Sequence, residues 1–313
     1  MWTFIILLGL LIAITLLILL FEKIMGGAEE RTITVNHDTL IPVVGNETAL
    51  NSLSQNKIYL PSACGGKGSC GTCKFRLIDY HEPPKPTEIS FLSKDEVENG
   101  VRLSCQTKVT TDLKILLPPG LLNAKVFQSK VVKIERMTYD IKMVRFELTE
   151  PMNFKPGQYA QIMVPGFEED RAYSIASDPK NPYIIELIIR QVPNGLASTY
   201  VNQVLKVGDK VRITGPFGDF FLHEESTKPI IMIAGGSGKA PIRSIIYRLI
   251  DKGFDREATY FFGARTQADL YLTDYFMDIS KQFKNFTYVP ALSHLPKEDD
   301  WAGERGLITD VVG

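Results

Sequence analysis

The chain has 313 residues, which is long enough for two to three domains. Apolar residues make up 44% of it and charged residues 23%, proportions that are ordinary for a globular protein. The formal net charge is −1, with both signs mixed along the sequence. This excludes the electrostatic case for a nucleic-acid-binding protein, which needs a basic patch or stripe.

An apolar segment opens the chain. Residues 4–21 read FIILLGLLIAITLLILLF, an uncharged run of about the length that spans a bilayer. A signal peptide would have a basic region, a shorter apolar core and a small-residue cleavage site. We therefore expect residues 1–24 to be an uncleaved, single-pass anchor in the inner or cell membrane. Lys23 and Arg31 follow the run and place the remaining domains in the cytoplasm, although nearby glutamates weaken this charge signal.

Residues 31–119 combine short β-rich runs with two short helical patterns. Helices are expected near residues 47–55 and 93–99, where Ser93 and Glu96 have the spacing of a capping box. The expected strands are ITVNH, TLIPVV, CKFRLI and KVTTDLKILLP. This pattern predicts a small α+β domain.

All four cysteines of the chain lie in this domain. Cys64, Cys70 and Cys73 are spaced C-x5-C-x2-C on a glycine-rich segment, and Cys105 follows later. Plant-type [2Fe–2S] clusters use nearly the same layout, in which a loop curls around two irons and a distant cysteine completes the ligands. The glycines permit close approach of peptide N–H groups to the sulfurs. Structural zinc and disulfides are the alternatives, although zinc sites usually have two C-x2-C pairs and a reducing cytoplasm disfavours disulfides.

Residues 121–225 change to longer β-rich runs, separated by turns such as Pro156-Gly157 and Pro165-Gly166. The runs are KVVKIERM, IKMVRFEL, YAQIMV, YIIELIIR and KVRITG, and a short helix is expected over ASTYVNQVL. They predict an antiparallel β-barrel. From residue 228 to residue 313 strands alternate with helices, and a Gly235–Gly238 turn joins the first strand to the first helix. Strand, glycine turn and helix is the geometry that binds a nucleotide pyrophosphate. The later helix is expected over DLYLTDYFMDIS.

The cysteine domain resembles a β-grasp ferredoxin through LPSACGGKGSCGTCKF and RLSCQ, and residues 121–313 resemble the ferredoxin–NADP reductase superfamily. The resemblance implies FAD at the R-x-Y-S motif. Arg171 would grip the pyrophosphate, Tyr173 would lie against the isoalloxazine ring, and Ser174 would hydrogen-bond near its N5 atom. Tyr173 and Ser174 are thus the expected catalytic residues. Gly195 and Ser198 would bind the cofactor through N–H groups at a helix N-terminus.

The same resemblance places a nicotinamide dinucleotide at Gly235, Gly236 and Gly238. Lys239 departs from the superfamily pattern, in which this position is commonly apolar, and would either contact phosphate or be solvated. Arg265 and Asp269 follow the second strand, where the adenosine ribose should lie. An acidic residue favours NADH and an arginine NADPH, and the similar stretches of relatives favour NADH.

The order of the expected parts, from membrane anchor through ferredoxin and flavin domains to NAD domain, resembles that of the F subunits of sodium-translocating NADH:quinone oxidoreductases. This implies a membrane-anchored NADH dehydrogenase component that passes a hydride to FAD and single electrons to a [2Fe–2S] cluster held by the four cysteines. The cluster would pass electrons on to integral membrane subunits of a ubiquinone-reducing complex. Quinone reduction and sodium translocation would belong to those subunits, since this chain has one span and no ionisable residue within it. Two alternatives are the reductase component of an oxygenase and a non-catalytic electron-carrier or assembly subunit.

The expected fold is therefore multidomain, α+β and α/β. It comprises a transmembrane helix at 1–24, a [2Fe–2S] ferredoxin-like domain at 31–119, an antiparallel β-barrel flavin domain at 121–225 and a Rossmann-like NAD domain at 228–313. The superfamily's NAD domain continues with further strands and a Cys-Gly-Pro-Pro segment, which this sequence lacks. We therefore expect this domain to be C-terminally incomplete and the sequence to be a fragment.

Overall fold

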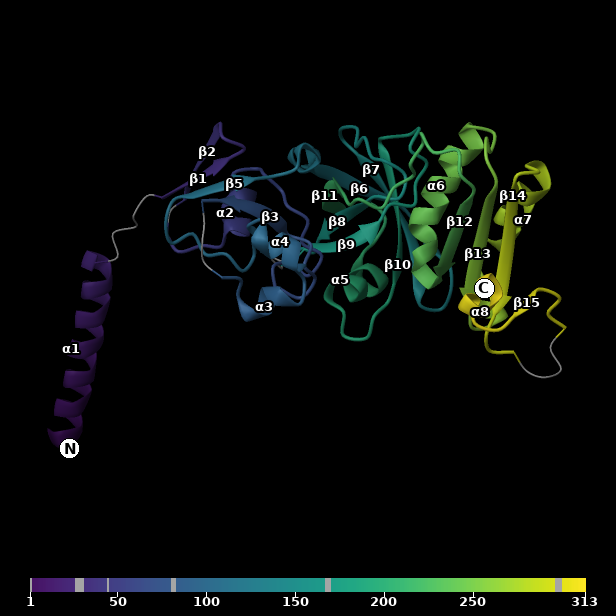
Figure 1. Ribbon diagram of the computed structural model, residues 1–313. Coiled ribbons are helices and arrows are strands. Elements are labelled where there is room, and N and C mark those ends of the chain that lie inside the picture. Colours follow the sequence, from purple (N-terminus) through teal and green to yellow (C-terminus); the bar gives the residue numbers. More distant parts are fainter. Residues whose placement is uncertain (1, 26–30, 44, 80–82, 167–169, 296–299) are drawn as a thin grey trace. The chain divides into compact units, whose positions relative to one another are not determined.

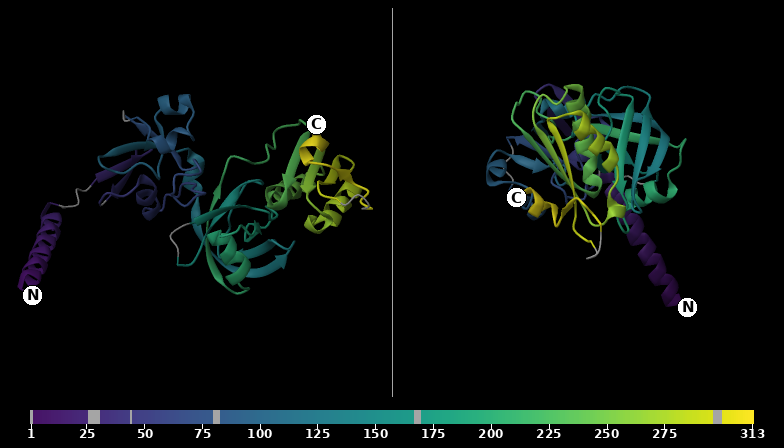
Figure 2. Two further views of the ribbon diagram at one scale, coloured as in Figure 1. Left: turned by 90° about the horizontal axis from the view of Figure 1, so that it is seen from below. Right: turned by 90° about the vertical axis from the view of Figure 1, so that its right-hand side faces the viewer.

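The structure is a computed structural model in which two compact units are distinguished (Figure 1). One unit comprises Met1–Asn56 and Phe75–Leu117, and the other comprises Lys57–Lys74 and Pro118–Gly313. Figure 2 gives two further views of the same chain. The residues that the structure describes are 2–25, 31–43, 45–79, 83–166, 170–295 and 300–313.

Helix α1 (Trp2–Met25) covers the apolar run at the start of the chain. The large apolar side chains that are described in this helix, between Phe4 and Leu17, are exposed, for example Phe4 at 71% and Leu11 at 66%. Across the described residues, no helix meets the combined requirements of length and apolarity for crossing a membrane. The predicted anchor at 1–24 is therefore helical, but its membrane-spanning character is not supported.

The first unit is built on a five-stranded mixed sheet with the order β2-β1-β5-β3-β4. Strands β1 and β5 are parallel neighbours, and Ile33 and Ile115 from them are fully buried. Both predicted helices are present, and the Ser93–Glu96 capping box forms as predicted. The elements are β1 (Arg31–Val35), β2 (Thr39–Val43), α2 (Ala49–Gln55), β3 (Lys74–Ile78), α3 (Pro86–Ile89), α4 (Lys94–Glu98), β4 (Val101–Leu103) and β5 (Leu113–Leu116). The predicted strand ITVNH ends at Val35, because Asn36 and His37 adopt positive φ angles of 49° and 74° and turn the chain.

The second unit begins with a six-stranded antiparallel sheet of order β10-β7-β6-β11-β8-β9. A bridge between Ile175 and Leu187 joins the two ends of this order and closes the sheet on itself. Its interior is apolar, with Phe146, Ile162 and Ile213 almost completely buried. Its elements are η1 (Pro119–Asn123), β6 (Lys125–Arg136), β7 (Ile141–Leu148), β8 (Tyr159–Met163), β9 (Asp170–Ser174), β10 (Ile184–Arg190), α5 (Leu196–Thr199), η2 (Tyr200–Val204) and β11 (Lys210–Phe217).

A parallel sheet of order β12-β13-β14-β15 follows, with α6 (Lys239–Asp251) and α7 (Thr273–Gln282) packed on one face (Figure 1). Tyr260 and Phe262 of its second strand point into the same core as Ile246 and Phe276 of the helices. Its elements are β12 (Ile230–Gly235), η3 (Gly236–Gly238), α6 (Lys239–Asp251), β13 (Ala258–Ala264), η4 (Gln267–Asp269), α7 (Thr273–Gln282), β14 (Phe286–Leu292), β15 (Glu304–Arg305) and α8 (Ile308–Val312). The predicted strand–helix alternation is thus present. The helix predicted from Asp269 begins only at Thr273, because Leu272 is left-handed with a φ of 55°.

The antiparallel and parallel sheets share one hydrophobic core. Ile141 and Ile188 of the antiparallel sheet are buried in the same cluster as Met232 of the parallel sheet. A buried ion pair crosses the same boundary, with Arg243 of α6 lying 2.5 Å from Glu186 of β10. Burial alone would raise the pKa of Glu186, but Arg243 and Arg145 hold that pKa below its usual value. The pair is therefore charged at neutral pH, and these two parts of the second unit have a defined geometry.

Candidate functional site

The cysteine-bearing loop is built for thiolates. All four cysteines are free; Cys73 and Cys105 are buried, and Cys64 and Cys70 are half-buried. The glycines between the first three cysteines have φ angles between 67° and 84°, a backbone conformation that other residues rarely adopt. The loop is therefore shaped by positions where a side chain would introduce strain.

Hydrogen bonds between backbone N–H groups and side-chain hydroxyls stabilise this loop. The N–H of Gly66 donates to Oγ of Ser62 at 2.8 Å, and the N–H of Ala63 donates to Oγ1 of Thr72 at 3.2 Å. The same hydroxyl of Thr72 lies 3.1 Å from Sγ of Cys70. Burial would raise the pKa of the Cys64 thiol, but the N–H groups of Ser69 and Lys67 and nearby side chains lower it overall. The loop therefore favours anionic sulfur at Cys64.

The donor set suits a [2Fe–2S] cluster, since four free thiols and sulfur-directed N–H groups are what such a cluster requires. No disulfide joins the cysteines. Among the described residues, no three His, Cys, Asp or Glu side chains are assembled as a ready metal site. The assignment of Cys64, Cys70, Cys73 and Cys105 as the ligands therefore stays a prediction.

The R-x-Y-S motif forms strand β9, which pairs with β8. Its three residues are half-buried, with Ser174 directly opposite Tyr159 and Tyr173 opposite Ala160. Burial raises the pKa of Tyr173 to about 12, although Arg171 nearby lowers it slightly. The Tyr173 phenol is therefore neutral at physiological pH. An arginine, a flat neutral ring and a hydroxyl thus follow one another on one strand, which suits a dinucleotide carrying a flavin ring.

The turn before β8 lies against the segment that follows β11. A side chain at Gly157 would meet the backbone of Phe220 and Phe221, at 2.7 Å from the carbonyl oxygen of the former. The side-chain amide of Gln158 donates to the carbonyl of Gly218 at 3.0 Å. This close backbone packing sets the position of β8 and hence that of its partner β9.

The second predicted flavin element is shorter than expected. Gly195 caps α5, which has only four residues and continues as the π-helical turn η2 instead of the single helix predicted over ASTYVNQVL. The Ser198 hydroxyl accepts from the N–H of Val192 at 3.1 Å and lies 3.2 Å from the carbonyl oxygen of Gly195. The Ser198 hydroxyl is therefore occupied by hydrogen bonds within the loop that precedes α5. At this helix start, the backbone N–H groups are the donors left for a cofactor phosphate.

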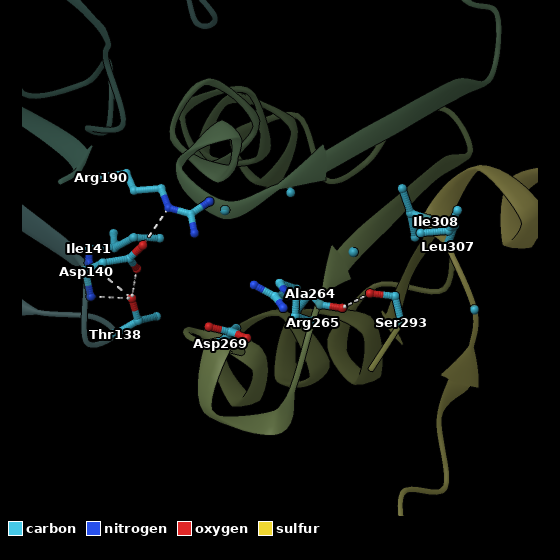
Figure 3. A pocket seen from close by; sticks show the side chains of 14 residues that line it. Thr138, Asp140, Ile141, Arg190, Ala264, Arg265, Asp269, Ser293, Leu307 and Ile308 are labelled. Atoms are coloured by element: carbon cyan, nitrogen blue, oxygen red, sulfur yellow. Dashed lines mark hydrogen bonds and ion pairs between the residues drawn. The ribbon is translucent and has the colours of Figure 1, made fainter. Parts of the chain in front are cut away.

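A pocket of about 300 Å³ lies where the two sheets of the second unit meet (Figure 3). It contains predicted residues Gly235, Gly236 and Arg265, whereas Gly238 is not among its lining residues. Within the described residues, no hydrogen bond or ion pair engages the Arg265 guanidinium. The lining residues are Thr138, Asp140, Ile141, Arg190, Gly235, Gly236, Gly263, Ala264, Arg265, Asp269, Ser293, Gly306, Leu307 and Ile308.

The antiparallel sheet contributes a cation to this pocket that the sequence reasoning missed. Nε of Arg190, at the end of β10, donates to Asp140 at 2.6 Å, and Thr138 supports the same carboxylate at 2.9 Å. Nη1 of Arg190 lies 3.5 Å from where a β-carbon on Gly236 would be. Figure 3 shows Arg190 and Arg265 on different sides of the pocket. Arg190 ends a strand, and Thr138 and Asp140 lie in a hairpin. No sequence motif marks these three residues as part of a pocket.

The Asp269 carboxylate accepts hydrogen bonds within the turn that contains it. Its Oδ2 accepts from the N–H of Thr266 at 3.0 Å and from the Thr266 hydroxyl at 2.9 Å. The carboxylate nevertheless lines the pocket beside Arg265. This end of the pocket thus presents both charges, one from Arg265 and one from Asp269, that the sequence predicts at the adenosine ribose.

Lys239 is neither solvated nor at the pocket. Its side chain is 0% exposed, and Nζ donates to the carbonyl oxygen of Tyr271 at 2.7 Å. The expectation that it would contact phosphate or solvent is therefore wrong. The reason is that the first turn of α6 directs this side chain into the aromatic core between α7 and the sheet.

Comparison with known protein families assigns the three parts of the chain. Residues 33–110 match a 2Fe-2S iron-sulfur cluster binding domain. Residues 128–222 match an oxidoreductase FAD-binding domain, and residues 232–312 match an oxidoreductase NAD-binding domain. Together these matches support a [2Fe–2S] cluster, FAD and NADH as the cofactors of this chain.

Individual relatives fall into two groups. The phenol hydroxylase P5 protein of Acinetobacter pittii is 36% identical over 88% of this chain and 79% of its own length. The F subunit of the Na(+)-translocating NADH-quinone reductase of Neisseria gonorrhoeae is 34% identical over 97% of this chain and 85% of its own length. Among solved structures, the Amycolatopsis cytochrome P450 reductase GcoB is 29% identical, with a TM-score of 0.72 over 90% of this chain and 86% of that one.

Proposed function

This chain belongs to the ferredoxin–NADP reductase superfamily, as a member with an additional [2Fe–2S] domain, and from that premise we propose that it delivers electrons from NADH to a membrane-bound quinone-reducing complex. It is an electron-transfer reductase that uses NADH, FAD and a [2Fe–2S] cluster. The proposal adds the direction of electron flow, the acceptor and attachment to the membrane. When bound, FAD and the cluster supply the conversion of a hydride, which carries two electrons, into single electrons.

The extent of the match is the observation that carries the membrane part of this proposal. The Neisseria relative is matched over 97% of this chain, which leaves about nine residues unmatched. Since α1 has 24 residues, the matched region must include most of it. The phenol hydroxylase protein is matched over only 88%. The exposed apolar side chains of α1 also support attachment of this helix to a membrane or to apolar membrane subunits.

The residues of β9 would hold and orient the flavin. Arg171 would bind its pyrophosphate with a fork of N–H donors, and Tyr173 would lie along the ring as a neutral phenol. Ser174 would offer a hydrogen bond at the edge of the ring that receives hydride. Arg190 would then bind the pyrophosphate of NADH beside Gly235 and Gly236, and Arg265 and Asp269 would lie at its adenosine ribose.

A second candidate function is the reductase component of an oxygenase. The 36% identity to the phenol hydroxylase P5 protein and the TM-score of 0.72 with the cytochrome P450 reductase favour it. Both functions use the same NADH, flavin and cluster chemistry, so they differ in the electron acceptor. Co-purification of the native protein with integral membrane subunits supports the first function. Recovery without them, together with rapid reduction of a soluble oxygenase, supports the second.

Anaerobic titration of the purified full chain with NADH tests the electron path. One NADH supplies two electrons, whereas the flavin and the cluster together accept three. We therefore expect the first equivalent of NADH to bleach part of the flavin absorbance and to produce the rhombic EPR signal of a reduced [2Fe–2S] cluster, with full bleaching only at a higher ratio. A cluster signal without flavin bleaching would instead indicate a non-catalytic electron carrier. Zinc or cystine in place of iron and acid-labile sulfide would overturn the proposal.

The cysteine ligands are tested by Cys70→Ala. We expect this variant to lose the EPR signal while NADH still bleaches its flavin, because the flavin residues lie on β9. Lys67→Ala is the matched control, since Lys67 is an exposed residue of the same loop. An unchanged EPR signal in Cys70→Ala would refute the ligand assignment.

A further inference from the structure

Lys239 is the first residue of α6 and follows the glycine turn directly. Its amine lies in a cage of five aromatic rings, and the closest is Phe262, whose ring centroid is 3.6 Å away. The other rings are Tyr260, Tyr271, Phe276 and Tyr288, with centroids between 4.8 and 5.9 Å away. A lysine in this position is fully enclosed by β13, β14, α7 and the segment that leads into α7.

The amine has polar partners but no acidic one. It donates to the carbonyl oxygen of Tyr271 at 2.7 Å and lies 3.3 Å from the Tyr288 hydroxyl. Within the described residues, no carboxylate pairs with it. Burial lowers the pKa of Lys239 to about 6, so the amine is mostly neutral at physiological pH. This side chain thus contributes a directed hydrogen bond to the backbone of Tyr271, and not a positive charge.

Tyr271 connects this buried amine to the nucleotide pocket. While its carbonyl accepts from Lys239, its own hydroxyl donates to the carbonyl oxygen of Gly236 at 2.7 Å. Gly236 is left-handed, with a φ of 52°, and lines the pocket assigned to NADH. Two hydrogen bonds therefore run in series from Lys239 through Tyr271 to the turn that would receive the pyrophosphate.

We propose that Lys239 and Tyr271 are positioning residues that hold the Gly236 turn in the conformation that binds the nicotinamide dinucleotide. This rests on the proposed function, because the pocket must be the NADH site. Neither side chain touches the dinucleotide in this arrangement. Their effect would be on the conformation of Gly236, which lines the pocket where the pyrophosphate would bind.

Tyr271→Phe tests the second link, because it removes one hydroxyl and leaves the ring in place. In the oxidised holoenzyme we expect the dissociation constant of NAD+, measured by calorimetry, to rise roughly three- to tenfold, the usual effect of one hydrogen bond. The KM for NADH should rise similarly while flavin reduction at saturating NADH stays unchanged. Tyr260→Phe is the matched control: it lies in the same cage, but its hydroxyl has no hydrogen-bond partner among the described residues.

Lys239→Met tests the first link, since it keeps an apolar stem in the cage and removes the donor to Tyr271. We expect it to raise the midpoint of thermal unfolding at pH 7 and nevertheless to weaken NAD+ binding. A residue that only supported the fold would not change these two quantities in opposite directions. In the double variant with Tyr271→Phe, the increase in the dissociation constant should be smaller than the product of the single increases.

The outcomes separate the two proposals. Failure of the wild-type holoenzyme to bind NAD+ would overturn the proposed function and this inference with it. Binding by the wild type, with Tyr271→Phe indistinguishable from Tyr260→Phe, would overturn the inference alone.

Discussion

At the scale of single residues, Lys239 gives the clearest link between burial and pH. Its pKa is lowered from 10.5 to about 6 by burial, and the titratable groups that face it in the described part of the chain are the phenols of Tyr260, Tyr271 and Tyr288. Burial raises the pKa of all three phenols, so they stay neutral together with the amine. The cage therefore contains neutral groups at physiological pH.

The stability of the fold should depend on pH through this lysine. Between pH 6 and pH 10.5 the unfolded chain binds a proton at Lys239 that the folded chain does not. The free energy of unfolding should therefore rise with pH, by up to roughly 1.4 kcal/mol per pH unit. Below pH 6 the full penalty of the buried charge remains.

Comparison with Lys239→Met isolates this contribution. We expect the stability advantage of the variant to be largest near pH 6 and to shrink steadily towards about pH 10, as measured by urea unfolding at fixed temperature. The tyrosines are common to both proteins, so their titration cancels. A difference that stays constant with pH would contradict the assignment.

The placement of residues within one local motif could be predicted from the sequence, while contacts between residues far apart in the sequence could not. Arg171, Tyr173 and Ser174 fall on one strand as their motif indicates. Arg190 and Asp140 were missed, because they meet the glycine turn only through the packing of two sheets. Lys239 was placed wrongly for the same reason, since nothing near it in the sequence reveals the aromatic cage.

At the scale of elements, two Pro-Gly turns of similar sequence have different surroundings. Gly157 and Gly166 both have positive φ angles, 111° and 82°. A β-carbon on Gly157 would meet the backbone of the segment after β11, whereas one on Gly166 would meet none of the described residues within 4 Å. The first turn is thus fixed by tertiary packing and the second by local conformation alone.

Alanine substitution should separate these two causes. We expect Gly166→Ala to lower the free energy of unfolding by about 1–2 kcal/mol, the strain of a left-handed residue. Gly157→Ala should cost roughly 2 kcal/mol more, because backbone atoms cannot move aside. Denaturant unfolding of the two variants measures the difference. Equal losses would mean that the close contact at Gly157 is relieved at no cost.

Element types could be predicted from hydrophobic periodicity, and several strands begin at the predicted residue. Strand β7 occupies the full predicted run IKMVRFEL. Ends were less predictable where a single residue adopts a left-handed conformation. Asn36 and His37 shortened one strand, and Leu272, which is not a typical turn residue, delayed one helix.

At the scale of the whole molecule, the apolar surface of α1 has a testable consequence. Deletion of residues 2–25 should move the protein from the membrane fraction to the soluble fraction with flavin and cluster retained, because none of the candidate site residues lies in α1. Fractionation followed by absorbance measures both. Persistent membrane association would show that contacts of the other domains, and not α1, hold the protein there.

Point substitutions provide the control for this deletion. Leu7→Lys/Leu11→Lys should release the protein as well, because charged side chains are costly in an apolar environment. Leu40→Lys should not, although Leu40 is as exposed, at 68%, because it lies on β2 and outside α1. Release by Leu40→Lys would point to a general effect of charge.

The shared core of the two sheets in the second unit limits how this enzyme could be recombined. Part of the pocket proposed for the dinucleotide is supplied by β10 and by the hairpin before β7, so under that proposal the preference for one dinucleotide is not a property of the parallel sheet alone. A chimera that imports a foreign nucleotide module would keep Thr138, Asp140, Ile141 and Arg190 of the pocket but would remove Arg243, so that Glu186 would keep only Arg145 as its partner. In related proteins, a substitution on the antiparallel side of this boundary should therefore be accompanied by a compensating substitution on the side of the parallel sheet.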